Sequence, residues 1–494
     1  MTPGTENLYT AAQTRALDHA AINEFGIPGI TLMARAASAC FDMLMDLWPE
    51  VAHIQVLCGT GNNGGDGYLI ADLAHKRGLA VQVIQLGDYS KITGDAALAR
   101  QQALVNGVTE QPYIPGNLHN EGVLVDAMLG TGLGGEVREP YLLAIHEVNA
   151  CALPVLAVDI PSGLCSDSGQ ILGAAVAADV TVSFIGLKRG LFTRDAPDYT
   201  GAIQFTDLEV PADAYQRVIP DCQRLELEHL LAAMPVRSAS AHKGSYGTVL
   251  VVGGDYGMAG AAAMAAEAAL RSGAGLVRAA TRPEHVSALV ARTPEIMARG
   301  VVSGQELEPQ LAQADVLVVG PGLGQTPWSE QLLQVASNSG KPMVLDADGL
   351  NLLIQGRIVD HRHRENWVLT PHPGEAARLL GISTAEVQAD RFAAARALQQ
   401  RYGGVVVLKG NGTLVAGPEA LLLSDYGNPG MASGGMGDVL SGIIGSLLAQ
   451  GIAPLEAAAL AVCVHGAAAD IAAEEGQSGL LATDLLAPMR ALLG

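Results

Sequence analysis

Short apolar runs, each ending near glycine or aspartate and each followed by a segment long enough for a helix, recur along the whole chain. In the first half they lie at Val51–Cys58, Ala80–Leu86, Gly122–Asp126 and Pro154–Asp159. Buried-looking runs of this length, separated by helical segments, are typical of a parallel sheet covered by helices on both faces. The sequence therefore predicts a doubly wound α/β fold for the first half.

The same rhythm restarts in the second half, which predicts a second α/β domain. A strand at Gly247–Gly254 opens it, and further short strands are expected at residues 276–280, 316–320, 342–346, 367–370 and 405–409. The pattern weakens between about Thr206 and Pro235, where prolines and charged residues gather. A chain of 494 residues also exceeds the usual size of one domain. We therefore expect two domains, residues 1–222 and 223–494.

The net charge of the chain limits which binding partners are expected, and its cysteines bear on the cellular compartment. The net charge of −21 argues against nucleic acids and anionic membranes as partners, and the six scattered cysteines form no C-x-x-C pair. The N-terminus has no basic segment followed by an apolar core, and the apolar stretch 439–469 is interrupted by polar residues and a proline. These features predict a cytoplasmic protein with no signal peptide and two buried helices, and the alanine-rich helices favour a homo-oligomer.

A glycine-rich segment, Gly59–Gly67, follows the first strand and is predicted to be a turn that leads into a helix over Tyr68–Arg77. Converging backbone amides and a helix N-terminus favour a bound phosphate, although a tight turn without a ligand is the alternative. Asp126 and Asp159 end two further strands, at the sheet edge where α/β proteins bind ligands.

Three segments of the first half resemble the epimerase domain of NAD(P)H-hydrate repair enzymes: NNGGDG at 62–67, DAMLGTGLGG at 126–135 and VDIPSG at 158–163. The resemblance implies a Rossmann-like fold, interconversion of the R and S hydrates of reduced nicotinamide nucleotides, and a potassium ion held by Asn63, Asp126 and Ser162. Oxygen ligands of this kind suit a hard cation. The resemblance to this epimerase domain also implies substrate contacts from Asn62, Asn63, Gly64, Gly65, Asp66, Gly130, Thr131, Gly132, Leu133, Gly134, Gly135, Glu136 and Asp159.

Asp159 is the candidate acid/base of this half. The hydrate carries a hydroxyl next to the ring nitrogen, so transient loss of hydroxide gives a planar iminium that either face can recapture. A carboxylic acid near that oxygen can supply and retrieve the proton.

The second half contains the motif NPGMASGGMGD at 428–438, just before an apolar helix expected over Val439–Leu448. Gly434, Gly435 and Gly437 precede that helix, so its first amides can form an anion hole, and Asp438 beside them is a candidate site residue. The alternative role for this aspartate is a helix cap.

Upstream, Lys409–Thr413 follows a strand and can place an ammonium group and several amides along a phosphate chain. The alternative is a hairpin turn through Asn-Gly with a surface lysine.

These features resemble the ribokinase-like superfamily, and more closely its ADP-dependent NAD(P)H-hydrate dehydratases. The matching segments are HKGSYG at 242–247, GPGLG at 320–324, DADGLN at 346–351, LTPHPGE at 369–375, KGNGT at 409–413 and the motif at 428–438. The resemblance implies that ADP gives AMP and phosphate with Mg²⁺, while Asp438 deprotonates the hydrate hydroxyl as it attacks the phosphoryl group. The implied contacts are Lys409, Gly410, Asn411, Gly412, Thr413 and Gly437 with the nucleotide, and Gly260, Gly322, His372 and Asp438 with the hydrate.

Two other functions remain open at this point. A small-molecule kinase of the ribokinase type would share Asp438 and the anion hole but transfer phosphate to a stable product. A binding protein with an inactive first domain is the third possibility. The segments NNGGDG and VDIPSG speak against the kinase, which has no need of them.

Overall fold

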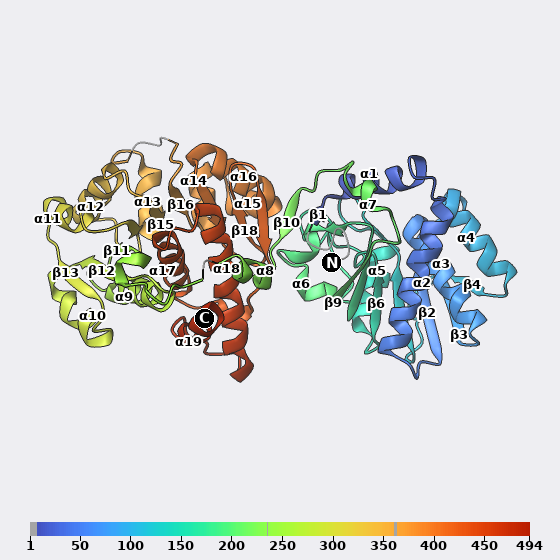
Figure 1. The fold of residues 1–494 in the computed structure, drawn as a ribbon. Coiled ribbons are helices and arrows are strands. Elements are labelled where there is room, and N and C mark those ends of the chain that lie inside the picture. Colours follow the sequence, from blue (N-terminus) through green and yellow to red (C-terminus); the bar gives the residue numbers. More distant parts are fainter. Residues whose placement is uncertain (1–6, 235, 360–362) are drawn as a thin grey trace. The chain divides into compact units, whose positions relative to one another are not determined.

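The computed structural model describes residues 7–234, 236–359 and 363–494, and the chain divides into two compact units, Met1–Gln223 and Arg224–Gly494 (Figure 1). The first residues of the chain, which bear on the predicted lack of a signal peptide, lie outside the described part.

The first unit is built on a seven-stranded sheet in which all neighbours are parallel, in the order β4-β3-β2-β5-β6-β7-β9. Its strands are β2 (His53–Cys58), β3 (Ala80–Gln85), β4 (Thr109–Pro112), β5 (Val123–Ala127), β6 (Val155–Val158), β7 (Val180–Phe184) and β9 (Ala202–Thr206). A short strand, β1 (Asn7–Tyr9), pairs with β8 (Leu187–Lys188) and β10 (Cys222–Arg224). The chain reverses its direction of travel across the main sheet between β2 and β5, and open α/β sheets bind ligands at such a point.

Helices cover both faces of this sheet. They are α1 (Ala11–Asn23), α2 (Gly29–Leu47), α3 (Asn62–Lys76), α4 (Gly94–Val105), α5 (Tyr141–Ala150), α6 (Pro197–Thr200) and α7 (Ala212–Tyr215). Val56 and Val125 are buried in the cluster with α2 and α3, whereas their neighbours Leu57 and Leu124 are buried with α5. Because successive strand residues face opposite sides, both sides of the sheet are apolar and buried. The predicted doubly wound, Rossmann-like arrangement is confirmed.

The sheet of the second unit runs in the order β13-β12-β11-β14-β15-β16-β17-β18-β19. Its strands are β11 (Thr248–Val252), β12 (Leu276–Thr281), β13 (Met297–Gly300), β14 (Val316–Val319), β15 (Met343–Leu345), β16 (Trp367–Leu369), β17 (Val405–Leu408), β18 (Thr413–Ala416) and β19 (Leu421–Ser424). Strands β11 to β17 are parallel, and β18 and β19 continue the sheet as antiparallel strands.

The helices of the second unit are α8 (Leu227–Ala232), α9 (Ala259–Arg271), α10 (Val286–Arg292), α11 (Gly304–Leu311), α12 (Pro327–Asn338), α13 (Ala347–Gln355), α14 (Pro373–Leu380), α15 (Thr384–Ala389), α16 (Arg391–Tyr402), α17 (Met436–Ala449), α18 (Pro454–Ala472) and α19 (Leu486–Leu493). Helices α9, α17 and α18 share one buried cluster with the strands. Small residues allow this close packing: a β-carbon on Gly442 would lie 2.2 Å from the carbonyl oxygen of Ala265.

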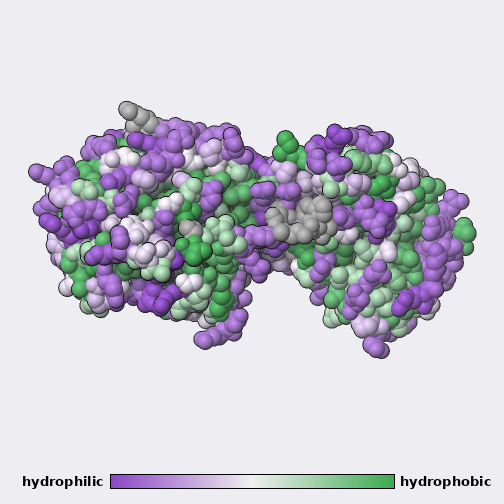
Figure 2. Space-filling view, in the orientation of Figure 1, coloured by the Kyte–Doolittle hydropathy of each residue, from purple (hydrophilic) through white to green (hydrophobic). Residues whose placement is uncertain are grey.

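The apolar stretch 439–469 forms α17 and α18, two helices buried in this core, as predicted. Within the described residues, one helical segment, Pro454–Glu475, is long and apolar enough to cross a membrane, and 72% of its most apolar window is buried inside the protein. Hydrophilic and hydrophobic residues are interspersed on the face shown in Figure 2.

Candidate active sites

The glycine-rich segment of the first unit is the start of a helix rather than a turn. Helix α3 begins at Asn62, so the prediction of a helix from Tyr68 was wrong. The glycines allow the helix to lie against the sheet: a β-carbon on Gly64 would be 2.1 Å from the carbonyl oxygen of Gly59, and one on Gly67 would be 2.7 Å from the Cys58 sulfur. The positive end of α3 is thereby held at the carboxyl end of β2.

Asp126, at the end of β5, forms a buried network with Ser162. The Ser162 hydroxyl and main-chain N–H donate to the two carboxylate oxygens at 2.6 and 2.7 Å, and the Met128 N–H donates at 3.2 Å. Burial raises the pKa of Asp126 to about 6, and the hydrogen bonds from Ser162 oppose the rise. An opposing positive charge would favour the ionised form.

Asn63 completes this group of oxygen atoms. Its side-chain Nδ2 donates to the Leu129 carbonyl at 3.2 Å, and Leu129 in turn donates its N–H to the Ser162 hydroxyl at 2.8 Å. Its Oδ1 atom is buried and accepts no hydrogen bond from any described residue. An orphaned amide oxygen beside a buried carboxylate is the donor set of a hard cation, and the described residues form no cluster of three or more His, Cys, Asp or Glu for another kind of metal.

Asp159 follows β6 in a left-handed backbone conformation, with φ of 68°. Its carboxylate accepts hydrogen bonds from the Phe184 N–H at 3.2 Å and from the Nζ atom of Lys188. The Lys188 side chain is only 1% exposed and is also held by the Ser183 hydroxyl at 3.1 Å. The candidate acid/base is therefore one half of an ion pair.

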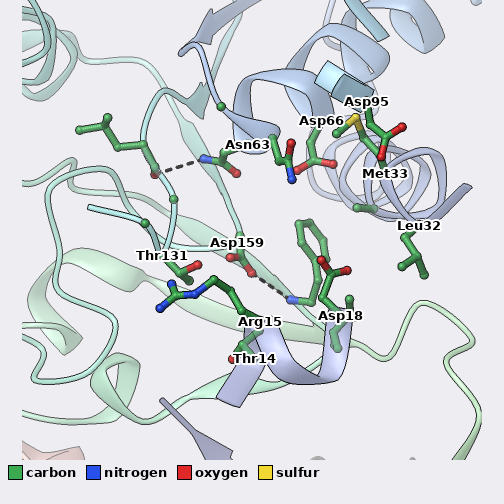
Figure 3. Close-up of a pocket in the computed structure, with 18 of the residues that line it drawn as sticks. Thr14, Arg15, Asp18, Leu32, Met33, Asn63, Asp66, Asp95, Thr131 and Asp159 are labelled. Atoms are coloured by element: carbon green, nitrogen blue, oxygen red, sulfur yellow. Dashed lines mark hydrogen bonds between the residues drawn. The ribbon is translucent and has the colours of Figure 1, made fainter. Parts of the chain in front are cut away.

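A cavity of about 580 Å³ lies in front of this ion pair (Figure 3). Of the predicted substrate contacts it is lined by Asn62, Asn63, Asp66, Gly130, Thr131, Gly132, Leu133, Gly134 and Asp159. Gly64 and Gly65 lie in the packing behind it, where a β-carbon on Gly65 would be 2.7 Å from the Met33 sulfur. Gly135 and Glu136 are outside the described lining. Burial raises the pKa of Asp66 well above its usual range, and the charges of Asp159 and Asp18 add to the rise.

The cavity also has walls that the sequence did not reveal. Thr14, Arg15 and Asp18 reach it from α1, and Lys188 reaches it from β8. The sequence signal for Lys188 was a lysine four residues after the apolar run that forms β7.

In the second unit, helix α17 begins at Met436, earlier than predicted. Gly435 is its cap with φ of 97°, so Gly437 and Asp438 lie in its first turn instead of before it. Glycine suits position 435 because a residue with a side chain rarely adopts this left-handed conformation. Asp438 therefore stands among the free amides of the helix start, as an anion hole requires.

The pKa of Asp438 is raised to about 7, first by burial and then by the negative charge of Asp346. The ammonium of Lys409 opposes this rise. A carboxylate that titrates near neutrality is suited to act as a general base.

Lys409 follows β17 and pairs with Asp346, at the end of β15. The Nζ–Oδ1 distance is 2.8 Å, and the Ser441 hydroxyl of α17 donates to the other carboxylate oxygen at 2.8 Å. A β-carbon on Gly437 would lie 3.2 Å from the Nζ atom, so the lysine lies against the helix start. The charge of Asp346 raises the pKa of Lys409, although burial alone would lower it.

The residues after Lys409 do form a hairpin turn, since β17 and β18 are antiparallel, but the lysine side chain is only 21% exposed and is paired with Asp346. The turn is fixed from below by the buried guanidinium of Arg391, which donates to the carbonyls of Leu408, Lys409 and Gly412 at 3.1–3.4 Å. Neither Arg391 nor the pairing with Asp346 was found from the sequence.

His372 caps α14, with its Nδ1 accepting the Gly374 N–H at 3.0 Å and its Nε2 3.5 Å from Glu375. The Lys409 N–H donates to the Pro371 carbonyl at 2.9 Å, which joins this loop to the lysine. Burial lowers the pKa of His372, although the charge of Glu375 opposes the change.

Gly322 has φ of 56°, and a β-carbon there would be 2.6 Å from the Met258 carbonyl oxygen, two residues before Gly260. The same loop is tied to Asp348 by the Gly324 N–H at 2.9 Å, and the charge of Asp348 contributes to the raised pKa of Asp438. Of the predicted hydrate contacts, Gly260 therefore lies at the start of α9, while Gly322 lies in a loop tied to Asp348.

Two family models match the chain: one described as NAD(P)H-hydrate dehydratase over residues 249–490, and one described as YjeF-related protein N-terminus over residues 29–190. The bifunctional NAD(P)H-hydrate repair enzyme Nnr of Coxiella burnetii is 48% identical over 98% of this chain and 99% of its own length.

Solved structures match as well. A ribokinase-like superfamily protein from Enterococcus faecalis has a TM-score of 0.51 at 29% identity, covering 56% of this chain and 96% of that one. The ADP/ATP-dependent NAD(P)H-hydrate dehydratase of Bacillus subtilis, co-crystallised with ATP and Mg²⁺, has a TM-score of 0.48 at 32% identity, covering 54% and 96%. The match to the Enterococcus faecalis protein confirms the predicted ribokinase-like fold.

Proposed function

The chain belongs to the family of bifunctional NAD(P)H-hydrate repair enzymes, and on that premise we propose that residues 1–222 carry the epimerase and residues 223–494 the dehydratase. The two family matches, 29–190 and 249–490, support this division because they fall on either side of it. The first activity interconverts the R and S hydrates, and the second returns the S hydrate to reduced nicotinamide nucleotide.

Asp438 is the base of the dehydratase. Its carboxylate takes the proton of the hydrate hydroxyl while that oxygen bonds to the terminal phosphorus of ADP, and the bond from this phosphorus to the oxygen of AMP breaks. The phosphate ester then leaves as inorganic phosphate, pushed by the electron pair of the ring nitrogen, and loss of a ring proton completes the dehydration. The observation that carries this proposal is the place of Asp438 in the first turn of α17, with a pKa raised to about 7.

ADP is held by Lys409, Gly410, Asn411, Gly412, Thr413 and Gly437. Lys409 supports this role because Asp346 fixes its ammonium beside the amides of the helix start, where a phosphate receives hydrogen bonds from both. The hydrate contacts Gly260, Gly322 and His372. Mg²⁺ bound together with ADP would offset the charge of the phosphates that these residues hold.

In the first unit, Asn63, Asp126 and Ser162 would hold potassium. The buried, unpartnered Oδ1 of Asn63 and the raised pKa of Asp126 support this assignment, since a cation would give the Asn63 oxygen a partner and the Asp126 carboxylate a countercharge. The ion would add a fixed positive charge behind the anionic substrate.

The epimerase substrate contacts the predicted residues that line the cavity, namely Asn62, Asn63, Asp66, Gly130, Thr131, Gly132, Leu133, Gly134 and Asp159. The Asp159–Lys188 pair holds the proton that converts the departing hydroxide to water, and it recovers that proton when water adds to the opposite face of the iminium. The cavity of about 580 Å³ in front of the pair leaves room for the ring.

We propose a cytoplasmic homo-oligomer whose partners are the two hydrates and ADP, with neither nucleic acid nor membrane. The net charge of −21 supports the exclusion of polyanionic partners.

Two variants test the assignment. Asp438→Asn should abolish ADP-dependent dehydration yet still interconvert the hydrates. Asp159→Asn should dehydrate the S hydrate but consume the R hydrate no faster than spontaneous epimerisation allows. Asp46→Asn, at an exposed position, is the control and should retain both activities. Loss of both activities in either folded active-site variant, or normal epimerisation by Asp159→Asn, would refute the assignment.

A further inference from the structure

The epimerase cavity is rich in acidic groups although its substrate is an anion. Asp18, Asp66, Asp95 and Asp159 line it, whereas the cations of the described lining are Arg15 and Lys188. A dinucleotide carries at least two negative charges on its pyrophosphate. The cavity therefore needs a positive group that is free to meet a phosphate.

Lys188 cannot serve in this way. It is almost fully buried and is bound to Asp159, the Ser183 hydroxyl and the Phe184 carbonyl. Its positive charge is neutralised by the Asp159 carboxylate with which it pairs.

Arg15 is in a different state. It lies on α1 at an exposed position, and its guanidinium forms no ion pair or hydrogen bond with any described residue, Asp18 on the next turn included. Figure 3 shows the side chain extended along the cavity wall on the side where Thr131 lies. A guanidinium presents donors in a planar fork that matches phosphate oxygens.

The loop that contains Thr131 presents a second set of donors. A β-carbon on Gly132 or Gly134 would meet nothing within 4 Å, so both positions face open space, and both residues line the cavity. Their N–H groups donate no hydrogen bond within the described part of the chain. Free amides in a glycine loop are suited to anion binding.

We propose that Arg15 and the amides of Gly132 and Gly134 bind a phosphate group of the nicotinamide dinucleotide, which makes Arg15 a substrate-binding residue of the epimerase. The inference rests on the proposed epimerase function and names the group that compensates for the acidic wall. The phosphate is either one of the pyrophosphate bridge or the 2′-phosphate of the NADPH hydrate.

The test compares Arg15→Gln, Arg15→Lys and, as a matched control, Arg77→Gln, which removes an exposed arginine at the far end of α3. Epimerisation is followed by chromatography of the R and S hydrates without ADP, so that the dehydratase does not consume them. We expect Arg15→Gln to raise KM about tenfold or more with kcat within about twofold of the parent, because a charged hydrogen bond made equally in ground and transition state is lost. The KM of Arg15→Lys should lie between those of the parent and Arg15→Gln, because lysine keeps the positive charge but lacks the planar fork of donors.

The two hydrates distinguish the phosphates. An equal rise in KM for NADH and NADPH hydrates identifies the pyrophosphate, and a rise confined to NADPH hydrate identifies the 2′-phosphate. An Arg15→Gln variant with the parental KM for both hydrates overturns the proposal, as does an equal loss in Arg77→Gln.

Calorimetric titration with the same hydrates, fitted with separate sites for the two units, separates this proposal from the proposed function; the affinities compared are those of the epimerase site. If the parent binds hydrate but does not epimerise it, the epimerase assignment fails, while weaker binding by Arg15→Gln still supports the phosphate contact. Unchanged affinity in Arg15→Gln overturns it.

Discussion

Replacing Asp346 by asparagine is expected to move the pH dependence of the dehydratase. In the parent, the base is active when ionised, so kcat/KM should rise with pH and reach half its plateau at the Asp438 pKa of about 7. At pH 6 about one tenth of the carboxylate is ionised, and at pH 5 about one hundredth, so activity should fall about tenfold per pH unit. This fall in activity on the acidic side of the pH profile is called the acidic limb, and a carboxylate at its usual pKa of 3.8 would show no such limb above pH 5.

Asp346→Asn removes a negative charge that raises the pKa of Asp438 and leaves Lys409, which lowers it. The limb should therefore shift to lower pH, by about one unit or more. Asparagine can still accept the hydrogen bond from Ser441, but KM for ADP should rise because Lys409 is less firmly held.

The assay measures initial rates of ADP-dependent recovery of reduced nicotinamide between pH 5 and 9, with the spontaneous rate subtracted. Epimerisation by the same preparation checks that the first unit is intact. A parental limb near pH 4, or a limb in Asp346→Asn that stays at the parental position, would refute the reasoning about Asp438.

Three further predictions concern packing, potassium and the nucleotide turn. Gly64→Ala should destabilise the first unit by about 2 kcal/mol or more, because its β-carbon meets a backbone oxygen, whereas Gly132→Ala, at an open position, should leave the melting temperature unchanged; equal effects would contradict the packing argument. Because the pKa of Asp126 is raised, the stability that its protonated form contributes is lost as pH rises through about 6. KCl should therefore stabilise the first unit at pH 8 more than at pH 5, and at ten times Kd the stabilisation at pH 8 should be about 1.4 kcal/mol. An equal effect of NaCl, or an equal effect of KCl on Asn63→Ala, would argue against the site. Arg391→Met should raise KM for ADP more than it lowers kcat, measured by the same absorbance assay, and a parental KM would show that the turn does not need the guanidinium.

The strands were predictable because each is a short apolar run with a clear end. Those around Asp126 and Asp159 begin and end within a few residues of the predicted limits, and the switch between β2 and β5 places both carboxyl ends at the cavity side. The starts of α3 and α17 were misplaced because glycine has a low helix propensity, whereas close packing against strands or an anion site requires it there. At both helix starts, tertiary packing and the site therefore outweigh the low helix propensity of glycine.

The pairings within the sites could not be predicted. Lys409 and Asp346 are 63 residues apart in sequence, and Lys188 and Asp159 are 29 apart, so no local spacing links them. The sheet order β15-β16-β17 brings Asp346 and Lys409 together, whereas Lys188 reaches Asp159 because β8 follows shortly after β7, the neighbour of β6. Arg15 was missed for the same reason, because nothing in the sequence of α1 shows that it lines a cavity formed by later strands.

The most direct test of the central claim, two complementary active sites in one chain, uses a mixture of both NADH-hydrate epimers with Mg²⁺ and ADP. Recovery of near-ultraviolet absorbance is followed to its end, with controls that lack nucleotide or protein. The account predicts ADP-dependent recovery of nearly all the hydrate, faster than spontaneous epimerisation allows. Recovery that stops at the S fraction would contradict an active epimerase, and no recovery with ADP or ATP would contradict the dehydratase.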